Sequence, residues 1–152
     1  MAARTLSCLT RLACAGFLVS GLAQAEPATN AATISVNVGN LRNMKGSLAC
    51  RLHASAEGFP RSTTGTVSLR VKVTAGSTRC VFENVTPGTY AILVHHDEND
   101  NRQCDKNVLG MPIEGYGASN NRTHALRPPN WQESKLDIES GKDRALSISL
   151  RY

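Results

Sequence analysis

Five carboxylates gather in a polar segment that directly follows a strongly apolar stretch of the chain. Residues 95–117 read HHDENDNRQCDKNVLGMPIEGYG, and the acidic side chains fall within 18 positions. Oxygen-bearing side chains occupy positions 1, 3, 5 and 9 of a loop, a spacing that suits the ligands of a hard cation such as calcium. These side chains are Asp97, Asn99, Asn101 and Asp105, and Glu114 could reach back as a bidentate carboxylate. The sequence therefore predicts a calcium site at residues 97–105.

Two other interpretations of this segment stay open. Asp and Asn are common in turns because their side chains bond their own backbone, so the loop could form without an ion. Alternatively, His95, His96 and Cys104 offer the softer ligands that zinc or copper prefers. Consecutive strand residues point to opposite faces, which argues against both histidines binding one ion. We expect His96 to orient the loop by a hydrogen bond to one of its carboxylates and His95 to pack on the other face.

The same segment holds residue types that occur in hydrolases. His96 and Asp97 could supply a base and its orienting carboxylate, and Ser119 and Cys104 are the candidate nucleophiles. No Gly-x-Ser-x-Gly motif accompanies them, and nothing in the sequence brings them together. We therefore predict a protein that has no catalytic residues and is not an enzyme.

A further group of side chains suits a surface that binds a partner. Tyr, Trp and Arg are enriched at binding hot spots. The residues predicted for this surface are Tyr116, Arg122, Arg127 and Trp131. Trp131 follows a Pro-Pro pair and could instead pack inward and pin its loop to the domain. The expected partner is an unidentified protein or glycan of the cell envelope.

The N-terminal residues have the pattern of a secretory signal peptide. Basic residues precede an apolar run at residues 12–23, and residues 23–25 form a small-x-small cleavage site. The run is far shorter than the roughly 20 residues that a membrane span needs. We predict cleavage after Ala25, a flexible segment at 26–32, a single domain at 33–152, and a periplasmic or secreted location.

Charge and cysteine content narrow the class of protein further. Without residues 1–25 the chain carries 15 basic and 12 acidic residues, a net charge of +3, and this mild, dispersed charge does not favour nucleic-acid binding. Three cysteines remain, which predicts one disulfide and one unpaired thiol in an oxidising compartment. Cys50 and Cys80 lie on the expected inward faces of strands, whereas Cys104 lies in the acidic loop. We therefore pair Cys50 with Cys80.

Apolar and polar residues alternate with a period of two through most of the chain. The alternating segments are residues 34–38, 48–52, 67–73, 136–138 and 146–152. Residues 89–96 are apolar at both parities, which predicts a central strand covered on both faces, and Pro87-Gly88 predicts a hairpin turn before it. About seven short strands with one long polar loop at 97–134 predict an all-β antiparallel sandwich.

Longer motifs resemble one bacterial family. The run FENVTPGTY at residues 82–90 is similar to a hairpin of prealbumin-like and carboxypeptidase-regulatory-like sandwiches. Together with HDENDN, GMPIEGYGASNN and a later Pro-Pro pair, it resembles the uncharacterised domain-of-unknown-function family 2141 (DUF2141) over residues 33–152. The resemblance implies an exported β-sandwich of no known activity. The family loop usually carries glycine where this chain has Arg102, so the bend at position 6 of a calcium loop must be strained or different here.

Overall fold

The computed structural model describes residues 30–75, 78–124 and 127–152. The predicted signal peptide at residues 1–25 lies outside these residues, as does most of the predicted flexible segment at 26–32. Ala32, the last residue of that segment, is buried in the first strand and pairs with Val85. No helix among the described residues is long and apolar enough to cross a membrane.

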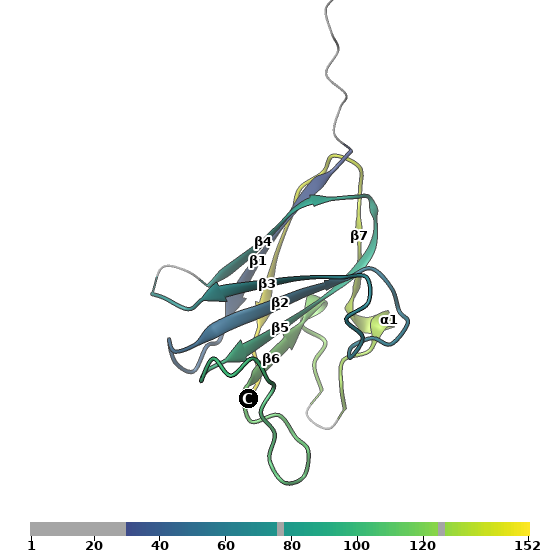
Figure 1. Cartoon of the computed structure of the whole chain (residues 1–152). Coiled ribbons are helices and arrows are strands. Elements are labelled where there is room, and N and C mark those ends of the chain that lie inside the picture. Colours follow the sequence, from purple (N-terminus) through teal and green to yellow (C-terminus); the bar gives the residue numbers. More distant parts are fainter. Residues whose placement is uncertain (1–29, 76–77, 125–126) are drawn as a thin grey trace, which may run out of the picture.

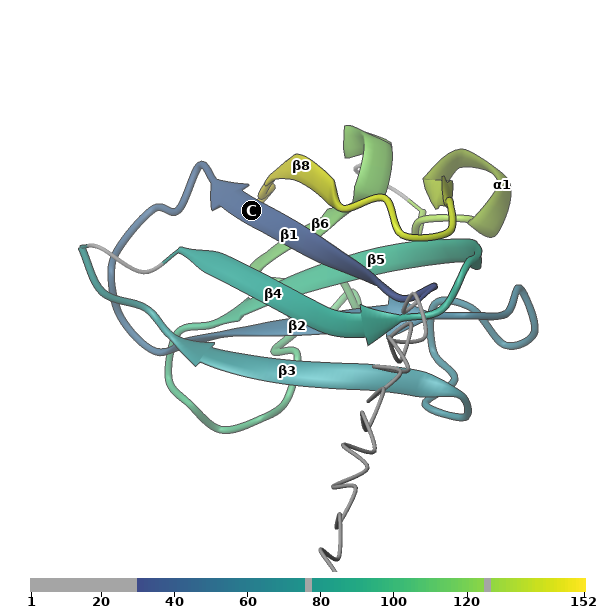
Figure 2. The ribbon, with the colours of Figure 1, turned by 90° about the horizontal axis from the view of Figure 1, so that it is seen from above.

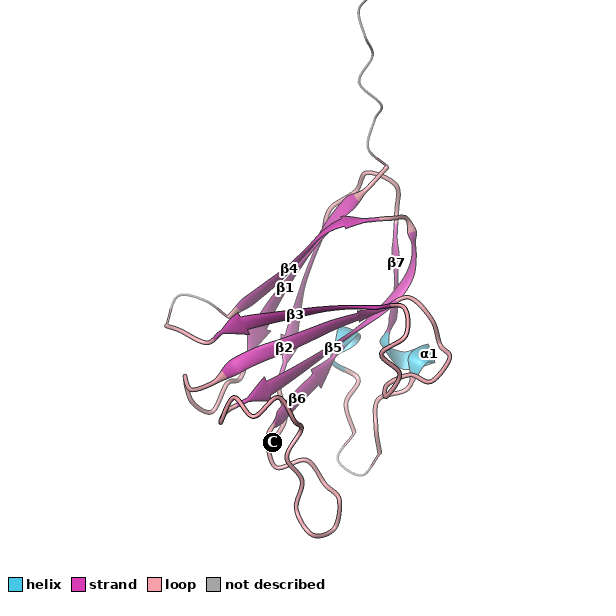
Figure 3. Ribbon diagram, viewed as in Figure 1, coloured by secondary structure: helices cyan, strands magenta, loops and turns pink. Residues whose placement is uncertain are grey.

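Two β-sheets pack face to face, as the alternation predicts (Figures 1 and 3). The three-stranded sheet has the order β4-β1-β8, formed by β4 (Arg79–Val85), β1 (Ala32–Gly39) and β8 (Arg144–Ser149). The five-stranded sheet has the order β3-β2-β5-β6, and β7 pairs with the first half of β5. Its strands are β2 (Ser47–His53), β3 (Thr66–Lys72), β5 (Gly88–Asp97), β6 (Gly115–Ala118) and β7 (Lys135–Ile138). The prediction of an all-β sandwich is confirmed.

Two features of the sheets differ from the expected arrangement. The turn at Pro87-Gly88 is no hairpin, because β4 pairs with β1 in one sheet and β5 pairs with β2 in the other. A turn sequence fixes local dihedral angles but not the partners of the strands that it joins, and here it carries the chain between sheets. The pairing of β1 with β8 is parallel, so the three-stranded sheet is mixed. Figure 2 shows β3 and β4 side by side where the two sheets meet.

Strand β6 lies inside the segment that the sequence predicts to be one long loop. Its four residues, GYGA, contain two glycines and carry no apolar alternation. A β-carbon on Gly117 would lie 2.6 Å from a methyl carbon of Ile148, and one on Gly115 would lie 2.6 Å from the Tyr152 ring. Glycine therefore lets β6 approach the C-terminal segment closely. Two short helical turns follow, η1 (Ser119–Asn121) and α1 (Trp131–Ser134).

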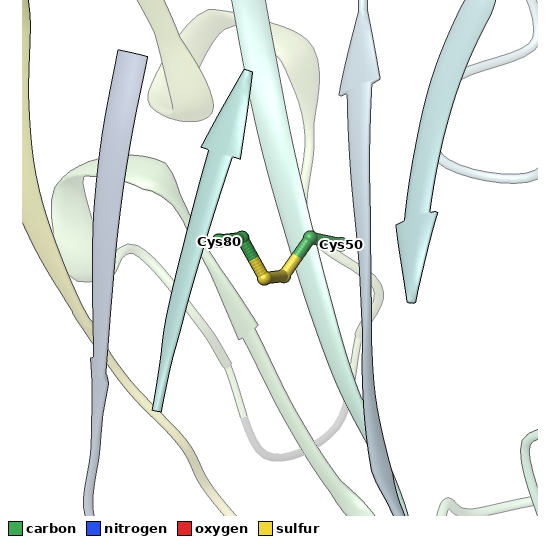
Figure 4. Close-up of a disulfide and its surroundings, with 2 residues drawn as sticks. All are labelled: Cys50 and Cys80. Carbon is green, nitrogen blue, oxygen red and sulfur yellow. A yellow bond between two sulfur atoms is a disulfide. The ribbon is translucent and has the colours of Figure 1, made fainter. Parts of the chain in front are cut away.

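The core lies between the sheets and contains the predicted disulfide. Its fully buried aliphatic and aromatic side chains are Ile34, Val36, Leu48, Ile92, Ile148 and Leu150, with Phe82 and Val94 nearly so. Cys50 on β2 bonds to Cys80 on β4 with a Cα–Cα distance of 6.6 Å, so the bridge ties one sheet to the other (Figure 4). The remaining cysteine of the described residues, Cys104, forms no disulfide.

Candidate functional site

Asp97 anchors the start of the acidic loop at the end of β5. Its side chain is fully buried and accepts hydrogen bonds from the backbone N–H groups of Asn101 at 3.1 Å and Arg102 at 2.8 Å. The Arg70 guanidinium on β3 lies 2.7 Å from the same carboxylate. Burial alone would raise the pKa of Asp97, but the bonds from Arg70 and Arg102 outweigh it and hold the pKa below its usual value.

The other predicted cation ligands meet around Asp105. The side-chain amides of Asn99 and Asn101 donate to its two oxygens at 2.8 and 2.9 Å. The buried carboxylate of Glu114 accepts the backbone N–H of Asp105 at 3.1 Å. The structure thus brings all five side chains into one hydrogen-bonded network. Every carboxylate oxygen of Asp97, Asp105 and Glu114 accepts a bond from a protein donor.

In this arrangement the side chains of the network bond to protein donors, so they would have to rearrange before a cation could bind. Within the described part of the chain, no group of three or more His, Cys, Asp and Glu side chains is placed to hold a metal ion. Calcium would require the amides of Asn99 and Asn101 to turn their oxygens inward and Arg70 to release Asp97. Calcium binding therefore stays a prediction of the sequence, and so does binding of zinc or copper.

The two adjacent histidines have exchanged the roles expected of them. His96 faces the core, where its two ring nitrogens lie 2.8 Å from the Tyr152 hydroxyl and 2.8 Å from the Lys45 carbonyl. Its predicted bond to a loop carboxylate is therefore wrong. His95 faces outward, and its Nε2 lies 2.9 Å from Glu114. Because β5 is apolar on both faces, its sequence gives no sign of which histidine lies beneath the loop.

A cleft of about 300 Å³ lies beside this loop on the outer face of the five-stranded sheet. Part of its lining is a row of paired residues across four strands, Arg70 on β3, Ala49 on β2, His95 on β5 and Tyr116 on β6. Parts of three loops complete the lining, at residues 60–61, 102–112 and 127–129, and Figure 1 shows these loops around the sheet. The cleft thus depends on strand register as well as on loops.

Positive charge dominates this cleft. Its cationic side chains are Arg51, Arg61, Arg70, Arg102, Lys106 and Arg127, and none of the described residues that line it is acidic. Arg70 pairs with Asp97, and Arg127 pairs with Glu133 at 2.8 Å. The other four cations form no ion pair within the described ranges. A concave surface lined by uncompensated charges of one sign concentrates ions of the other sign.

Arg102 adds its charge from a strained backbone position. Its φ is 66°, in the left-handed region that a β-carbon disfavours by about 1–2 kcal/mol. The bend expected at this position is therefore made without glycine, and the N–H bond to Asp97 helps to hold it. A second hollow of about 260 Å³ adjoins the cleft and shares Arg51, Arg70 and Arg102 with it. Three arginines consequently line both hollows.

A family model with the description "Uncharacterized protein conserved in bacteria (DUF2141)" matches residues 36–146, which include all the described residues that line the cleft. The chain belongs to this family. No curated protein and no solved structure matches the chain. Membership of DUF2141 confirms the resemblance seen in the sequence motifs and assigns no activity.

The four residues predicted for a partner surface of this DUF2141 chain do not lie together in the structure. Tyr116 and Arg127 line the cleft, whereas Arg122 is exposed outside its lining. Trp131 is half-buried and packs edge-on against Phe59, with ring centroids 5.7 Å apart. This contact joins the loop after β2 to α1, as the alternative prediction for Trp131 expects.

The hydrolytic groups considered for this DUF2141 chain lie apart. Ser119 is fully buried, and its hydroxyl contacts backbone groups of Ile92 and Ser134. Cys104 lines the cleft, where desolvation and nearby Glu114 raise the pKa of its thiol. A raised pKa favours the unreactive protonated thiol.

The sequence prediction for this DUF2141 chain did not assign a binding role to most of the cationic residues of the cleft. Arg51 and Arg70 occupy outward positions of alternating strands, which normally indicate only a solvated face. Arg61 and Lys106 stand in separate loops with no shared motif. Register pairs Arg51 with Leu93 and Arg70 with Ala49, next to His95. A local pattern carries no information on such pairing.

Proposed function

We propose that this DUF2141 protein is an exported, non-catalytic binding protein that holds a small anionic ligand in the cleft. The observation that carries the proposal is the gathering of six cationic side chains around about 300 Å³ with no carboxylate in the described lining. Small-molecule sites run from roughly 300 to 1,000 Å³, so the cleft suits a compact ligand. Arginine forks match the paired oxygens of phosphate, sulfate and carboxylate groups.

The lining also supports a ligand that has an apolar part. Leu93, Met111 and Pro112 line the cleft together with Tyr116. Their surfaces suit a hydrocarbon or ring, whereas Arg51 and Arg102 suit an anionic group. The ion pair with Asp97 restrains Arg70, which reduces the entropy lost when an anion binds. An amphiphilic anion therefore fits this lining better than a simple inorganic ion.

A fluorescent aromatic sulfonate, 8-anilinonaphthalene-1-sulfonate, tests this proposal. We expect saturable binding to the folded protein that weakens with added salt. Replacing Arg51 and Arg102 by alanine is expected to weaken binding about tenfold or more for each arginine removed, because each bond to a charged group contributes about 1.5–3 kcal/mol. Fluorescence titration measures the affinity.

A variant with Arg122→Ala and Arg144→Ala is the matched control for this titration. Both side chains are exposed outside the cleft lining, so the control removes the same charge elsewhere. Circular dichroism checks that both double variants remain folded. Equal loss of affinity in the two double variants would mean that net charge, not the cleft, attracts the anion.

We also infer calcium binding at the acidic loop, as a second function that stabilises one wall of the cleft. The supporting observation is that all five predicted ligands already belong to one network at the end of β5. They are Asp97, Asn99, Asn101, Asp105 and Glu114. Binding would replace their internal hydrogen bonds by ion contacts.

Thermal unfolding with calcium or with a chelator tests this second function. A site of about 1 mM affinity, as in extracellular modules, would raise the midpoint by about 4–6 °C at about 10 mM calcium. Asp105→Asn is expected to remove the rise, since it weakens the ligand set. No rise in the unaltered protein at that concentration would exclude a calcium site of this affinity.

A further inference from the structure

The loop that walls the cleft ends in an apolar tip. Val108 and Leu109 are 102% and 82% exposed, the two most exposed large apolar side chains of the described residues. Figure 1 shows the loop between β5 and β6 projecting well beyond the sheets. Single exposed apolar residues are ordinary, but two adjacent ones at the end of a projecting loop form a surface that water solvates poorly.

Hydrogen bonds within the loop fix the turn at this tip. The Asn107 side chain accepts the backbone N–H groups of Leu109 and Met111, each at 3.0 Å. The Asn107 backbone donates to the Met111 carbonyl at 2.8 Å and accepts from Gly110 at 2.9 Å. Lys106 and Pro112 form a bridge at its base. These bonds hold Val108 and Leu109 at the end of a defined hairpin-like turn.

The same loop contributes to the cationic cleft. Arg102 and Lys106 precede the tip and Met111 and Pro112 follow it, and all four line the cleft. The chain therefore places cations at the base of the loop and apolar side chains at its end. Peripheral membrane proteins combine these two features, because cations attract anionic head groups and apolar side chains enter the boundary of the acyl region.

We propose that the anion held in the cleft is the phosphate-bearing head group of an anionic membrane lipid, and that Val108 and Leu109 enter the bilayer beside it. This inference rests on the proposed anion-binding function and names its ligand class. A wholly soluble ligand would leave the exposed tip without a role. A lipid accounts for both features, since its phosphate suits the arginines and its acyl chains surround the tip.

Sedimentation with lipid vesicles tests the proposal. Vesicles of phosphatidylcholine with phosphatidylglycerol at 3:1 are expected to bind the protein, and vesicles of phosphatidylcholine alone are expected to bind it at least tenfold more weakly. The variant Val108→Ser with Leu109→Ser is expected to lose about tenfold in affinity for the anionic vesicles. Equal binding to both kinds of vesicle, or unchanged binding by this variant, would overturn the proposal.

Two exposed valines elsewhere provide a matched control. Val67 on β3 and Val81 on β4 are 55% and 36% exposed, and neither lines the cleft. Val67→Ser with Val81→Ser is expected to bind vesicles as the unaltered protein does. Loss of binding equal to that of the tip variant would show that exposed apolar area in general, rather than the tip, drives association, and would overturn the inference.

The aromatic sulfonate separates failure of this inference from failure of the proposed function. The tip variant is expected to keep its affinity for the sulfonate, because the cleft arginines are unchanged. If the unaltered protein binds the sulfonate through Arg51 and Arg102 but no vesicles, the anion site stands and the lipid inference is overturned. If it binds neither, both are overturned.

Insertion itself can be followed with a fluorophore. With Cys104→Ser in place, Leu109→Cys provides a single unpaired thiol among the described residues for an environment-sensitive label. We expect a blue shift of its emission with anionic vesicles and no shift with soluble glycerol phosphate. A label that stays in water while the protein sediments with vesicles would rule out entry of the tip into the bilayer.

Discussion

Replacing Cys50 and Cys80 by alanine is expected to lower the free energy of unfolding by about 3–4 kcal/mol. The bridge spans 30 positions of sequence and joins the two sheets, so its loss enlarges the unfolded ensemble. The stretch that it closes includes the whole of β3, which forms one edge of the five-stranded sheet. Guanidinium unfolding of the oxidised protein and the double variant measures the difference.

The comparison should use the free energy extrapolated to water. Removing a cross-link exposes more surface on unfolding and steepens the denaturant dependence, so midpoints alone would mislead. Cys104→Ala is the matched control, since its thiol forms no disulfide, and we expect a change within about 0.5 kcal/mol. A loss below about 1 kcal/mol for the double variant would mean that packing between the sheets makes the bridge largely redundant.

The disulfide also bears on the cleft. On β2, Cys50 points inward while its neighbours Ala49 and Arg51 line the cleft on the outer face. A bridge that fixes β2 against β4 therefore fixes the strand from which Arg51 extends. We expect the double variant to bind the aromatic sulfonate less tightly, because the strand that carries Arg51 is then no longer tied to β4.

The sequence was sufficient for the class of fold and for the disulfide, because both depend on local alternation. On β2, Leu48, Cys50 and Leu52 alternate with outward residues, and all three are buried in the structure. The same signal placed Cys80 inward on its strand. Burial on one face of a strand is a local property with a clear period, so a single sequence reveals it.

The site could be predicted only in part, because its contacts join distant parts of the chain. The five residues of the predicted calcium loop do form one network, but their counter-charge, Arg70, lies 27 positions before Asp97. Strand β5 is apolar on both faces, so the alternation of its residues does not show which of His95 and His96 faces the core. The cleft requires the register of four strands, which no local pattern specifies.

Replacing Asp97 by asparagine is expected to lower the free energy of unfolding at neutral pH by about 2–3 kcal/mol, the contribution of a hydrogen bond to a charged group. The buried carboxylate accepts bonds from Arg70 and from the backbone of Asn101 and Arg102. In asparagine an NH2 group takes the place of one of the two acceptor oxygens. One of these N–H groups then faces a donor instead of an acceptor. Asp137→Asn, the same change at an exposed position on β7, is the control and is expected to have little effect.

The effect of Asp97 should vanish in acid. Although burial opposes it, the bonds from Arg70 and Arg102 lower the pKa of Asp97 in the folded protein below 3.8. As the pH falls, the unfolded chain takes up the proton first, so the stabilisation is complete above pH 3.8 and is lost through the lower folded pKa. Unfolding curves between about pH 7 and pH 2 should therefore converge for the two proteins. A constant difference across this range would assign the effect to packing.

Asp97→Asn should also raise the affinity of the cleft for anions, although it lowers the stability of the protein. The substitution removes the charge that pairs with Arg70 at 2.7 Å, so another cation of the lining becomes largely uncompensated. We therefore expect the variant to bind the aromatic sulfonate more tightly while unfolding more easily, because the gain in positive charge outweighs the lost restraint on Arg70. Weaker binding by a folded variant would mean that Asp97 acts mainly by holding Arg70 and the loop in position. Tighter binding that weakens with added salt would instead identify the charge of the cleft as the source of affinity, because binding of the sulfonate to apolar surface exposed by a loosened loop depends little on salt.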